Sequence, residues 1–123
     1  MNKEFIPYEQ ALTLKELGFD ESCLNFYFRG EALIEMKATH TFKEDSECVK
    51  APLYQQAFRW FRDKYNLIPD IQYYGNWNFE IFRIGEFAEP MDDVNVDYTF
   101  KGGTYEEAEL ESLNKLIEIV KSK

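Results

Sequence analysis

Residues 71–84 read IQYYGNWNFEIFRI, and this stretch decides the fold class. Two runs rich in aromatic and branched side chains, 71–74 and 77–84, flank the pair Gly75-Asn76. Such a pair is favoured in tight hairpins because its first position tolerates a positive φ. The stretch therefore predicts an antiparallel β-hairpin with a two-residue turn, and it is the clearest hairpin pattern in the chain.

Two helices are predicted before this hairpin. Residues 7–17 begin with a proline and are followed by Gly18, which suits a left-handed C-terminal cap. Residues 51–65 carry Pro52 near their start, and their aromatic and aliphatic side chains fall within about half of a helical wheel. We expect Asn66 to end this second helix and its aromatic side to cover a sheet.

Between these helices the pattern predicts a first hairpin. Residues 23–28 and 32–36 are aromatic and branched runs around the turn Arg29-Gly30-Glu31. The interval 37–50 is polar and weakly patterned, so we interpret it as a loop that has room for a short strand around 39–42.

The C-terminal part predicts a strand and then a helix. Residues 94–100 alternate between apolar and polar side chains, so one face of that strand should meet the core. Thr104 and Glu107 have the spacing of a capping box at the start of the last helix. The predicted order is α-β-β-α-β-β-β-α, an α+β fold with three helices packed on an antiparallel sheet.

Length and composition bound the class of protein. A chain of 123 residues has room for one domain, which we expect to span residues 1–123. The hydrophobic share of 45% and the aromatic share of 17% are too high for a disordered chain. No apolar run approaches the length of a membrane span, and residues 1–7 lack the apolar stretch of a secretory signal. We therefore expect a cytoplasmic protein without a membrane partner.

The net charge of −9 is concentrated in residues 86–111, which contain nine acidic residues and a single basic residue, Lys101. With a pI near 4.6, the chain is not expected to bind nucleic acid, because phosphate contacts need clustered Lys and Arg. A solvated face that keeps the protein soluble explains this acidity, and attraction of a basic protein surface is the alternative. The predicted acidic patch comprises Glu86, Glu89, Asp92, Asp93, Asp97, Glu106 and Glu107.

Residues that could carry chemistry are few. His40 is the only histidine of the sequence, and Cys23 and Cys48 stand far apart without a CxxC pattern. Gly102-Gly103 precedes a helix but lacks the GxxxxGK[ST] and GxGxxG patterns of phosphate-binding loops. We therefore predict no catalytic, cofactor-binding or metal-binding residue and no cofactor.

One helix face is a candidate contact surface. The polar side of residues 51–65 includes Arg residues and borders a tryptophan, and both residue types are enriched at interaction hot spots. Ordinary solvent-facing helix surface is the alternative interpretation. The predicted partner surface comprises Gln55, Gln56, Arg59, Trp60 and Arg62.

Three helical segments carry a resemblance to a known family. Residues 8–19 (YEQALTLKELGF), 51–65 (APLYQQAFRWFRDKY) and 105–120 (YEEAELESLNKLIEIV) resemble a family of small proteins encoded by bacteriophages and prophages of gut bacteria. The family has no assigned activity, so the resemblance supplies no catalytic residue. It implies an intracellular phage accessory protein, a class in which small host-directed binders are common.

We therefore expect a non-enzymatic, acidic, phage-type accessory protein that binds a host or phage protein. The alternative is a small-molecule or nucleotide binder, or an enzyme, that uses an aromatic pocket between sheet and helices. The identity of the protein partner and the oligomeric state stay open at this stage.

Overall fold

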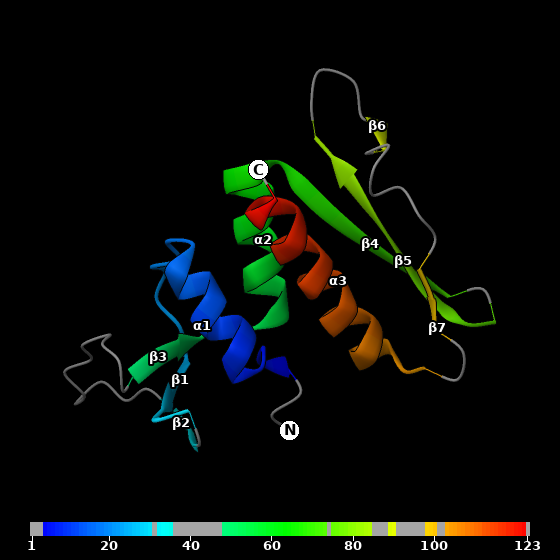
Figure 1. Cartoon of the computed structure of the whole chain (residues 1–123). Helices are drawn as coiled ribbons and strands as arrows, with labels where there is room; N and C mark the ends of the chain where they lie inside the picture. Colours follow the sequence, from blue (N-terminus) through cyan, green and yellow to red (C-terminus); the bar gives the residue numbers. More distant parts are fainter. Residues whose placement is uncertain are drawn as a thin grey trace. The chain divides into compact units, whose positions relative to one another are not determined.

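The computed structural model describes residues 4–30, 32–35, 48–73, 75–84, 89–90, 98–100 and 103–122. Within them the chain forms three helices and antiparallel strands, which confirms the α+β class (Figure 1). The elements are α1 (Tyr8–Glu16), β1 (Asn25–Phe28), β2 (Ala32–Glu35), β3 (Cys48–Ala51), α2 (Tyr54–Tyr65), β4 (Leu67–Tyr73), β5 (Trp77–Arg83), β6 (Glu89–Pro90), β7 (Tyr98–Phe100) and α3 (Tyr105–Lys121).

The chain divides into two compact units, an N-terminal unit of residues 1–56 and a C-terminal unit of residues 57–123. The strands form two sheets where the sequence pattern suggested one. The first has the order β2-β1-β3, and in the second β5 pairs with β4, β6 and β7. A single domain over residues 1–123 stays a prediction.

The end of α1 is a complete Schellman motif. Gly18 adopts φ 104°, and its N–H donates to the Lys15 carbonyl at 3.0 Å. The N–H of Phe19 donates to the Leu14 carbonyl at 2.9 Å, and the Phe19 side chain is buried. These bonds satisfy carbonyls that the end of a helix otherwise leaves free. The glycine stop predicted for this helix is confirmed.

The β1–β2 hairpin turns tightly against α1. Phe28 pairs with Ala32, and the turn between them holds Arg29 at φ 56° and Gly30 at φ 72°. Gly30 lies so close to the ring of Tyr8 that an added Cβ would stand 3.0 Å from its Cε2 atom. The absence of a side chain at Gly30 therefore lets the helix approach the turn.

The start of α2 is later than predicted. Ala51 belongs to β3 and pairs with Asn25, while the Pro52 carbonyl accepts a hydrogen bond from the Ile6 N–H at 3.0 Å. A proline disfavours the helical conformation in the residue before it, so Ala51 extends the strand and the helix begins at Tyr54. β3 also includes residues 48–50, which were expected to belong to a loop. Residues 36–47, including His40, lie outside the described residues.

The junction between α2 and β4 is made by a residue in the left-handed region. Asn66 has φ 60°, and its N–H donates to the Arg62 carbonyl at 3.0 Å, so the predicted stop is confirmed. β4 then begins at Leu67, earlier than the expected residue 71. Pro69 is tolerated inside β4 because, among the described strands, β4 pairs only with β5 and lies at the edge of its sheet.

The β4–β5 hairpin is confirmed, but its turn is one residue longer than predicted. Tyr73 pairs with Trp77, so residues 74–76 form a three-residue loop, and Gly75 has φ 81°. Only residues 98–100 of the expected strand 94–100 are described; they form β7 and pair with β5.

α3 covers the β4–β5 hairpin within the C-terminal unit. The Thr104 hydroxyl accepts a hydrogen bond from the Glu107 N–H at 3.2 Å, which is one of the two bonds of the predicted capping box. α3 packs against β4 and β5. The buried apolar side chains of these three elements are Leu67, Phe79, Ile81, Ala108, Leu113, Leu116, Ile117 and Ile119.

Candidate functional site

The polar face of α2 is only partly available as a surface. Gln55, Arg59 and Arg62 are exposed. Gln56 is half-buried, and its Nε2 atom donates to Glu21 Oε1 at 3.2 Å and to the Ser22 carbonyl at 2.8 Å. This amide therefore ties the start of α2, within the N-terminal unit, to the segment before β1.

Trp60 does not contribute exposed surface to that face. The sequence placed it at the edge of the apolar arc, where partial exposure was expected, but its exposed fraction is 6%. Its ring lies edge to face with Phe61 and Tyr65, at centroid separations of 5.1 and 5.5 Å. These packing contacts explain why the indole turns inward, so this residue is corrected to a buried one.

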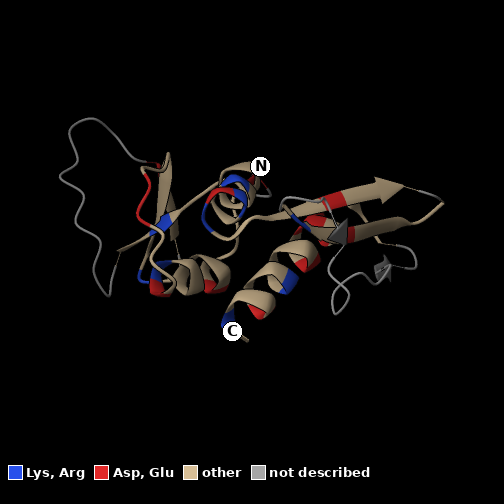
Figure 2. Cartoon of the chain, turned by 90° about the horizontal axis from the view of Figure 1, so that it is seen from above, with Lys and Arg blue, Asp and Glu red and all other residues tan. Residues whose placement is uncertain are grey.

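The predicted acidic patch is described in part. Glu86, Asp92, Asp93 and Asp97 lie outside the described residues, and of Glu89 the structure describes the backbone in β6. Glu106 and Glu107 are exposed in the first turn of α3. Figure 2 shows acidic positions along α3, with its basic positions in the C-terminal half.

Three aromatic side chains of the C-terminal unit meet at the surface, and we call them the aromatic cluster: Tyr73, Trp77 and Tyr105. The Tyr73 and Trp77 rings lie edge to face with centroids 5.0 Å apart, and Trp77 meets Tyr105 in the same way at 5.2 Å. Tyr73 is 60% exposed and Tyr105 is 38% exposed, while Trp77 is half-buried. Large aromatic groups held in contact and open to solvent are typical of binding surfaces.

The cluster is assembled from the hairpin register and the start of α3. Pairing of Tyr73 with Trp77 places both rings on the same sheet face as buried Phe79, which is the face that α3 covers. Tyr105 is the first residue of α3. The hairpin extends past the first turn of α3 (Figure 1), and Tyr73 near its tip is well exposed to solvent.

An acidic side chain is buried beside the cluster. Glu109 is one turn beyond Tyr105 on the same side of α3, and it is 8% exposed. Burial, and next the charge of Glu106, raise the pKa of the Glu109 carboxyl. Burial also raises the pKa of the Tyr105 hydroxyl, and the charges of Glu109 and Glu106 raise it further. The surroundings of these groups are therefore both desolvated and negative.

The opposite face of the hairpin is polar toward the tip, while Ile68 and Phe82 lie on it at the other end. Asp70 pairs across the strands with Glu80, and Gln72 pairs with Asn78. Gln72 Nε2 donates to Asp70 Oδ2 at 2.5 Å, and Asn78 Nδ2 donates to the Asn76 carbonyl at 3.1 Å. Over the described part of the chain, no group of three or more His, Cys, Asp or Glu side chains is arranged to hold a metal ion.

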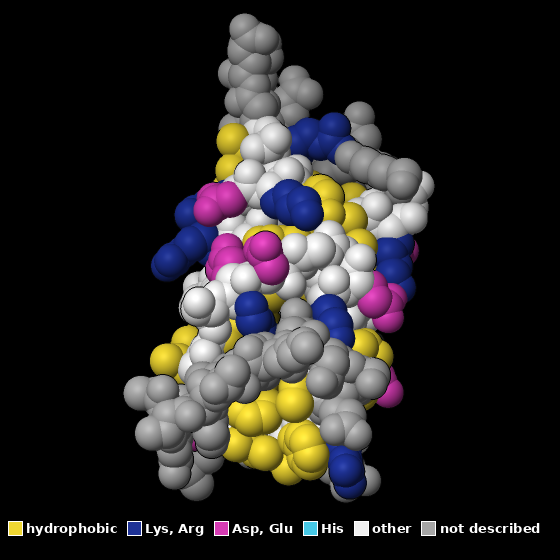
Figure 3. Space-filling view, turned by 90° about the vertical axis from the view of Figure 1, so that its left-hand side faces the viewer, with side chains coloured by type: hydrophobic (Ala, Val, Ile, Leu, Met, Phe, Trp, Pro, Cys, Tyr) yellow, Lys and Arg dark blue, Asp and Glu magenta, His cyan; other side chains and the backbone are white. Residues whose placement is uncertain are grey.

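Apolar side chains also reach the surface elsewhere, as Figure 3 shows for one view of the molecule. In the N-terminal unit, Phe28 and Ile34 are half-buried on the same face of the β2-β1-β3 sheet, and Leu24 before β1 is 64% exposed. Cys23 and Cys48 are both half-buried.

The aromatic cluster is absent from the residues singled out in the sequence. Its members are separated by up to 32 positions, and their contact depends on the three-residue loop, which the Gly75-Asn76 pair did not reveal. One pattern does point to it: the aromatic residues Tyr73 and Trp77 stand on both sides of the hairpin turn, where cross-strand aromatic pairs stabilise a hairpin.

Comparison with protein-family models, with curated proteins and with solved structures finds no match to this chain. None of the helices in the described ranges is long and apolar enough to cross a membrane.

Proposed function

We propose that this protein acts by binding another protein, of the host or of the phage, through the aromatic cluster. The observation that carries the proposal is the exposure of Tyr73 and Tyr105 while both rings keep edge-to-face contact with Trp77. Exposed aromatic side chains supply most of the binding energy in many interfaces. The cluster is therefore a suitable anchor for a partner.

The rigid support of the cluster strengthens this proposal. Tyr73 and Trp77 are held opposite each other by the hairpin, and Tyr105 is held by a helix whose start is capped by Thr104. Tyrosine has two rotatable side-chain bonds, so fixing it in a complex costs little conformational entropy. A preorganised aromatic surface of this kind binds without having to order itself first.

The acidic side chains near the cluster suit a partner with a basic surface. Glu106 and Glu107 are exposed in the same helical turn as Tyr105. Complementary charge accelerates association and weakens as salt is added. The resemblance of the helical segments to phage and prophage proteins favours a non-enzymatic accessory role in the cytoplasm of a bacterial host.

Affinity enrichment from a bacterial lysate tests this function. The full chain is immobilised as wild type, as Tyr73→Ser and as Leu24→Ser, and the proteins recovered at low and at high salt are quantified. Leu24→Ser is the matched control because it removes an equally exposed apolar side chain from the N-terminal unit. We expect one protein to be recovered by the wild type and by Leu24→Ser, and to be lost with Tyr73→Ser.

Recovery of that protein to the same extent by Tyr73→Ser would contradict the proposal, as would enrichment of nothing by the wild type over a column without protein. Binding of a small molecule or nucleotide in an aromatic pocket remains the alternative hypothesis. A metabolite that raises the melting temperature of the wild type and of Tyr73→Ser equally would favour that alternative.

A further inference from the structure

We propose that the aromatic cluster binds an arginine side chain of the partner, with the Glu109 carboxylate as its counter-ion. This inference rests on the proposed function and adds the chemistry by which the partner is recognised. It is drawn from the placement of three rings and one buried acid within the C-terminal unit.

The face of an aromatic ring carries negative potential and attracts a cation within about 6 Å of its centroid. Two other aromatic sites of the chain already hold a cation: Lys64 lies 5.1 Å from the Trp60 centroid, and Arg29 lies 5.0 Å from the Phe28 centroid. Within the described ranges no Lys or Arg occupies Tyr73, Trp77 or Tyr105 in this way, so a cation from outside has ring surface to bind.

Glu109 is only 8% exposed, and among the described residues its carboxylate has no hydrogen-bond or ion-pair partner. Its oxygens are not fully buried, so an external cation can reach them. Glu109 follows Tyr105 by one helical turn on the same side of α3, which places its carboxyl beside the cluster. Burial without a partner disfavours the ionised form, in agreement with the raised pKa of this carboxyl. A cation placed on the cluster would supply the missing partner.

The chemistry of the site favours arginine over lysine. The guanidinium group is planar, is weakly hydrated and stacks on aromatic faces, whereas an ammonium group is compact and strongly hydrated. A site built from three rings and a desolvated carboxylate offers few hydrogen-bonding groups to replace the water that a cation loses on binding. This loss costs the weakly hydrated guanidinium less than the strongly hydrated ammonium. Guanidinium also forms two parallel hydrogen bonds to a carboxylate, which suits Glu109.

Titration of the full chain with short peptides tests the inference. The probes are acetylated and amidated Gly-Gly-X-Gly-Gly peptides in which X is arginine, lysine or citrulline. Citrulline has nearly the shape of arginine without its charge. The readout is the NMR signal of the Trp77 indole N–H, assigned with Trp77→Phe, and the buried Trp60 indole serves as an internal reference.

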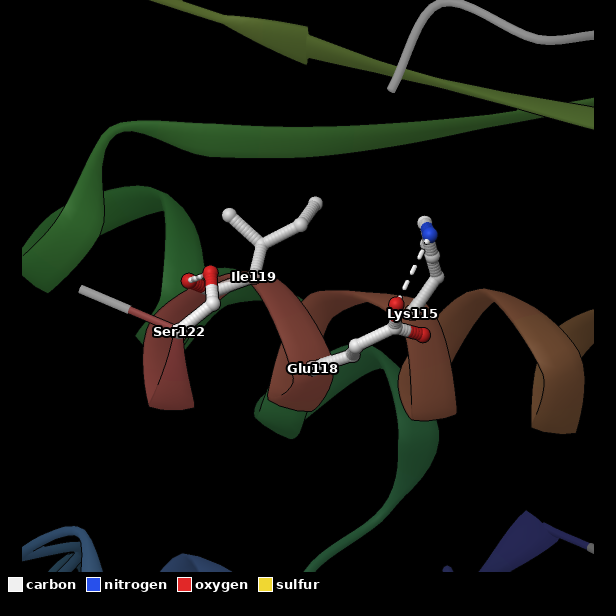
Figure 4. A network of polar contacts seen from close by, with 4 residues as sticks. All are labelled: Lys115, Glu118, Ile119 and Ser122. Carbon is white, nitrogen blue, oxygen red and sulfur yellow. Dashed lines mark hydrogen bonds and ion pairs between the residues drawn. The ribbon is translucent and has the colours of Figure 1, made fainter. Parts of the chain in front are cut away.

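We expect a saturable shift of the Trp77 signal with the arginine peptide, binding weaker by about fivefold with lysine and by about tenfold or more with citrulline. Glu109→Gln should weaken arginine binding about fivefold. The matched control is Glu118→Gln, near the far end of α3 (Figure 4). There Glu118 Oε1 accepts a hydrogen bond from Lys115 Nζ at 3.1 Å, and Ser122 Oγ donates to the Ile119 carbonyl. This control should bind arginine like the wild type.

Three results would overturn the inference: no saturable shift up to tens of millimolar peptide, equal binding of arginine and citrulline, or equal binding by Glu109→Gln and the wild type. Tighter binding of lysine than of arginine would overturn the choice of arginine. Failure here is distinct from failure of the proposed function. A partner that is lost with Tyr73→Ser but retained with Glu109→Gln supports protein binding and rejects the arginine contact.

Discussion

Tyr73 and Trp77 stand directly opposite each other in the β4–β5 hairpin, and their rings meet edge to face with centroids 5.0 Å apart. Asn66 and Ile84 form a hydrogen-bonded pair at the start of the hairpin, because the Ile84 N–H donates to the Asn66 carbonyl. Hydrogen-bonded and non-hydrogen-bonded pairs alternate along antiparallel strands, so Tyr73 and Trp77 form a non-hydrogen-bonded pair. Side chains approach most closely at such pairs. A slip of one residue would send Tyr73 to the polar face, so the turn decides whether the cluster exists.

Gly75→Ala should destabilise the hairpin through the backbone alone. Gly75 has φ 81°, and a Cβ built on it would meet no atom within 4 Å. The left-handed conformation costs an L-residue with a side chain about 1 kcal/mol. We expect the free energy of unfolding in urea to fall by about that amount. Gly75→Asn should lose less, because asparagine visits this region more readily, and equal losses would contradict the explanation.

Gly30→Ala should cost more than Gly75→Ala. Gly30 also has a positive φ, 72°, but its Cβ would stand 3.0 Å from Cε2 and 3.1 Å from Cζ of Tyr8. The Tyr8 ring is held edge to face against Tyr27, with centroids 5.7 Å apart, so moving it disturbs a second contact. We expect a loss of about 2–3 kcal/mol in urea unfolding.

A double-mutant cycle separates the two costs at Gly30. In a Tyr8→Ala background the clash is absent, so Gly30→Ala should then cost only the backbone term of about 1 kcal/mol. Additive losses would show that the Tyr8 ring moves aside freely and that the close approach carries no energy.

Asn66 should respond in opposite ways to glycine and alanine. Its φ of 60° ends α2 and turns the chain into β4. Asn66→Gly should leave the free energy of unfolding nearly unchanged, whereas Asn66→Ala should lower it by about 1 kcal/mol. Chemical denaturation of the three proteins checks this, and a more stable Asn66→Ala would rule out the left-handed cap as the reason for asparagine.

The helix ends could be predicted from the sequence because each depends on the chemistry of one or two neighbouring residues. Gly18 and Asn66 supply left-handed backbone, and Thr104 supplies a hydroxyl for the N–H of Glu107. Such local rules need no knowledge of the rest of the fold.

The predictions that were wrong concern features that depend on contacts between residues distant in sequence. Ala51 joins a strand because Asn25 offers a partner, and Trp60 is buried by packing that a helical wheel does not show. The aromatic cluster needs the hairpin register and the start of α3 together. Patterns within one segment predict where each residue lies in its helix or strand, but they do not predict these contacts between segments.

Glu109→Gln should stabilise the protein at neutral pH. Burial raises the pKa of this carboxyl above its ordinary 4.5, so the ionised form is less favourable in the folded than in the unfolded chain. The wild type therefore carries a penalty above the folded-state pKa, and this penalty disappears as the pH falls below the ordinary value. Urea unfolding at pH 7 and at about pH 3.5 should show Glu109→Gln more stable at the first and equal at the second.

Glu118→Gln, at an exposed acid of the same helix, should change stability by less than about 0.5 kcal/mol at either pH. A less stable Glu109→Gln at pH 7 would mean that the ionised carboxylate has a stabilising partner in the free protein, and the site for an external cation would then already be filled.

Stability and arginine binding should move in opposite directions at Glu109. A buried acid without a partner costs folding energy, and a site that lacks its ligand often carries such a cost. The arginine peptide should therefore raise the melting temperature of the wild type more than that of Glu109→Gln, although the variant starts from the higher value. Thermal unfolding at rising peptide concentration measures both quantities together. An equal rise of the melting temperature in the two proteins would show that Glu109 does not contribute to arginine binding and that the rings alone bind the cation.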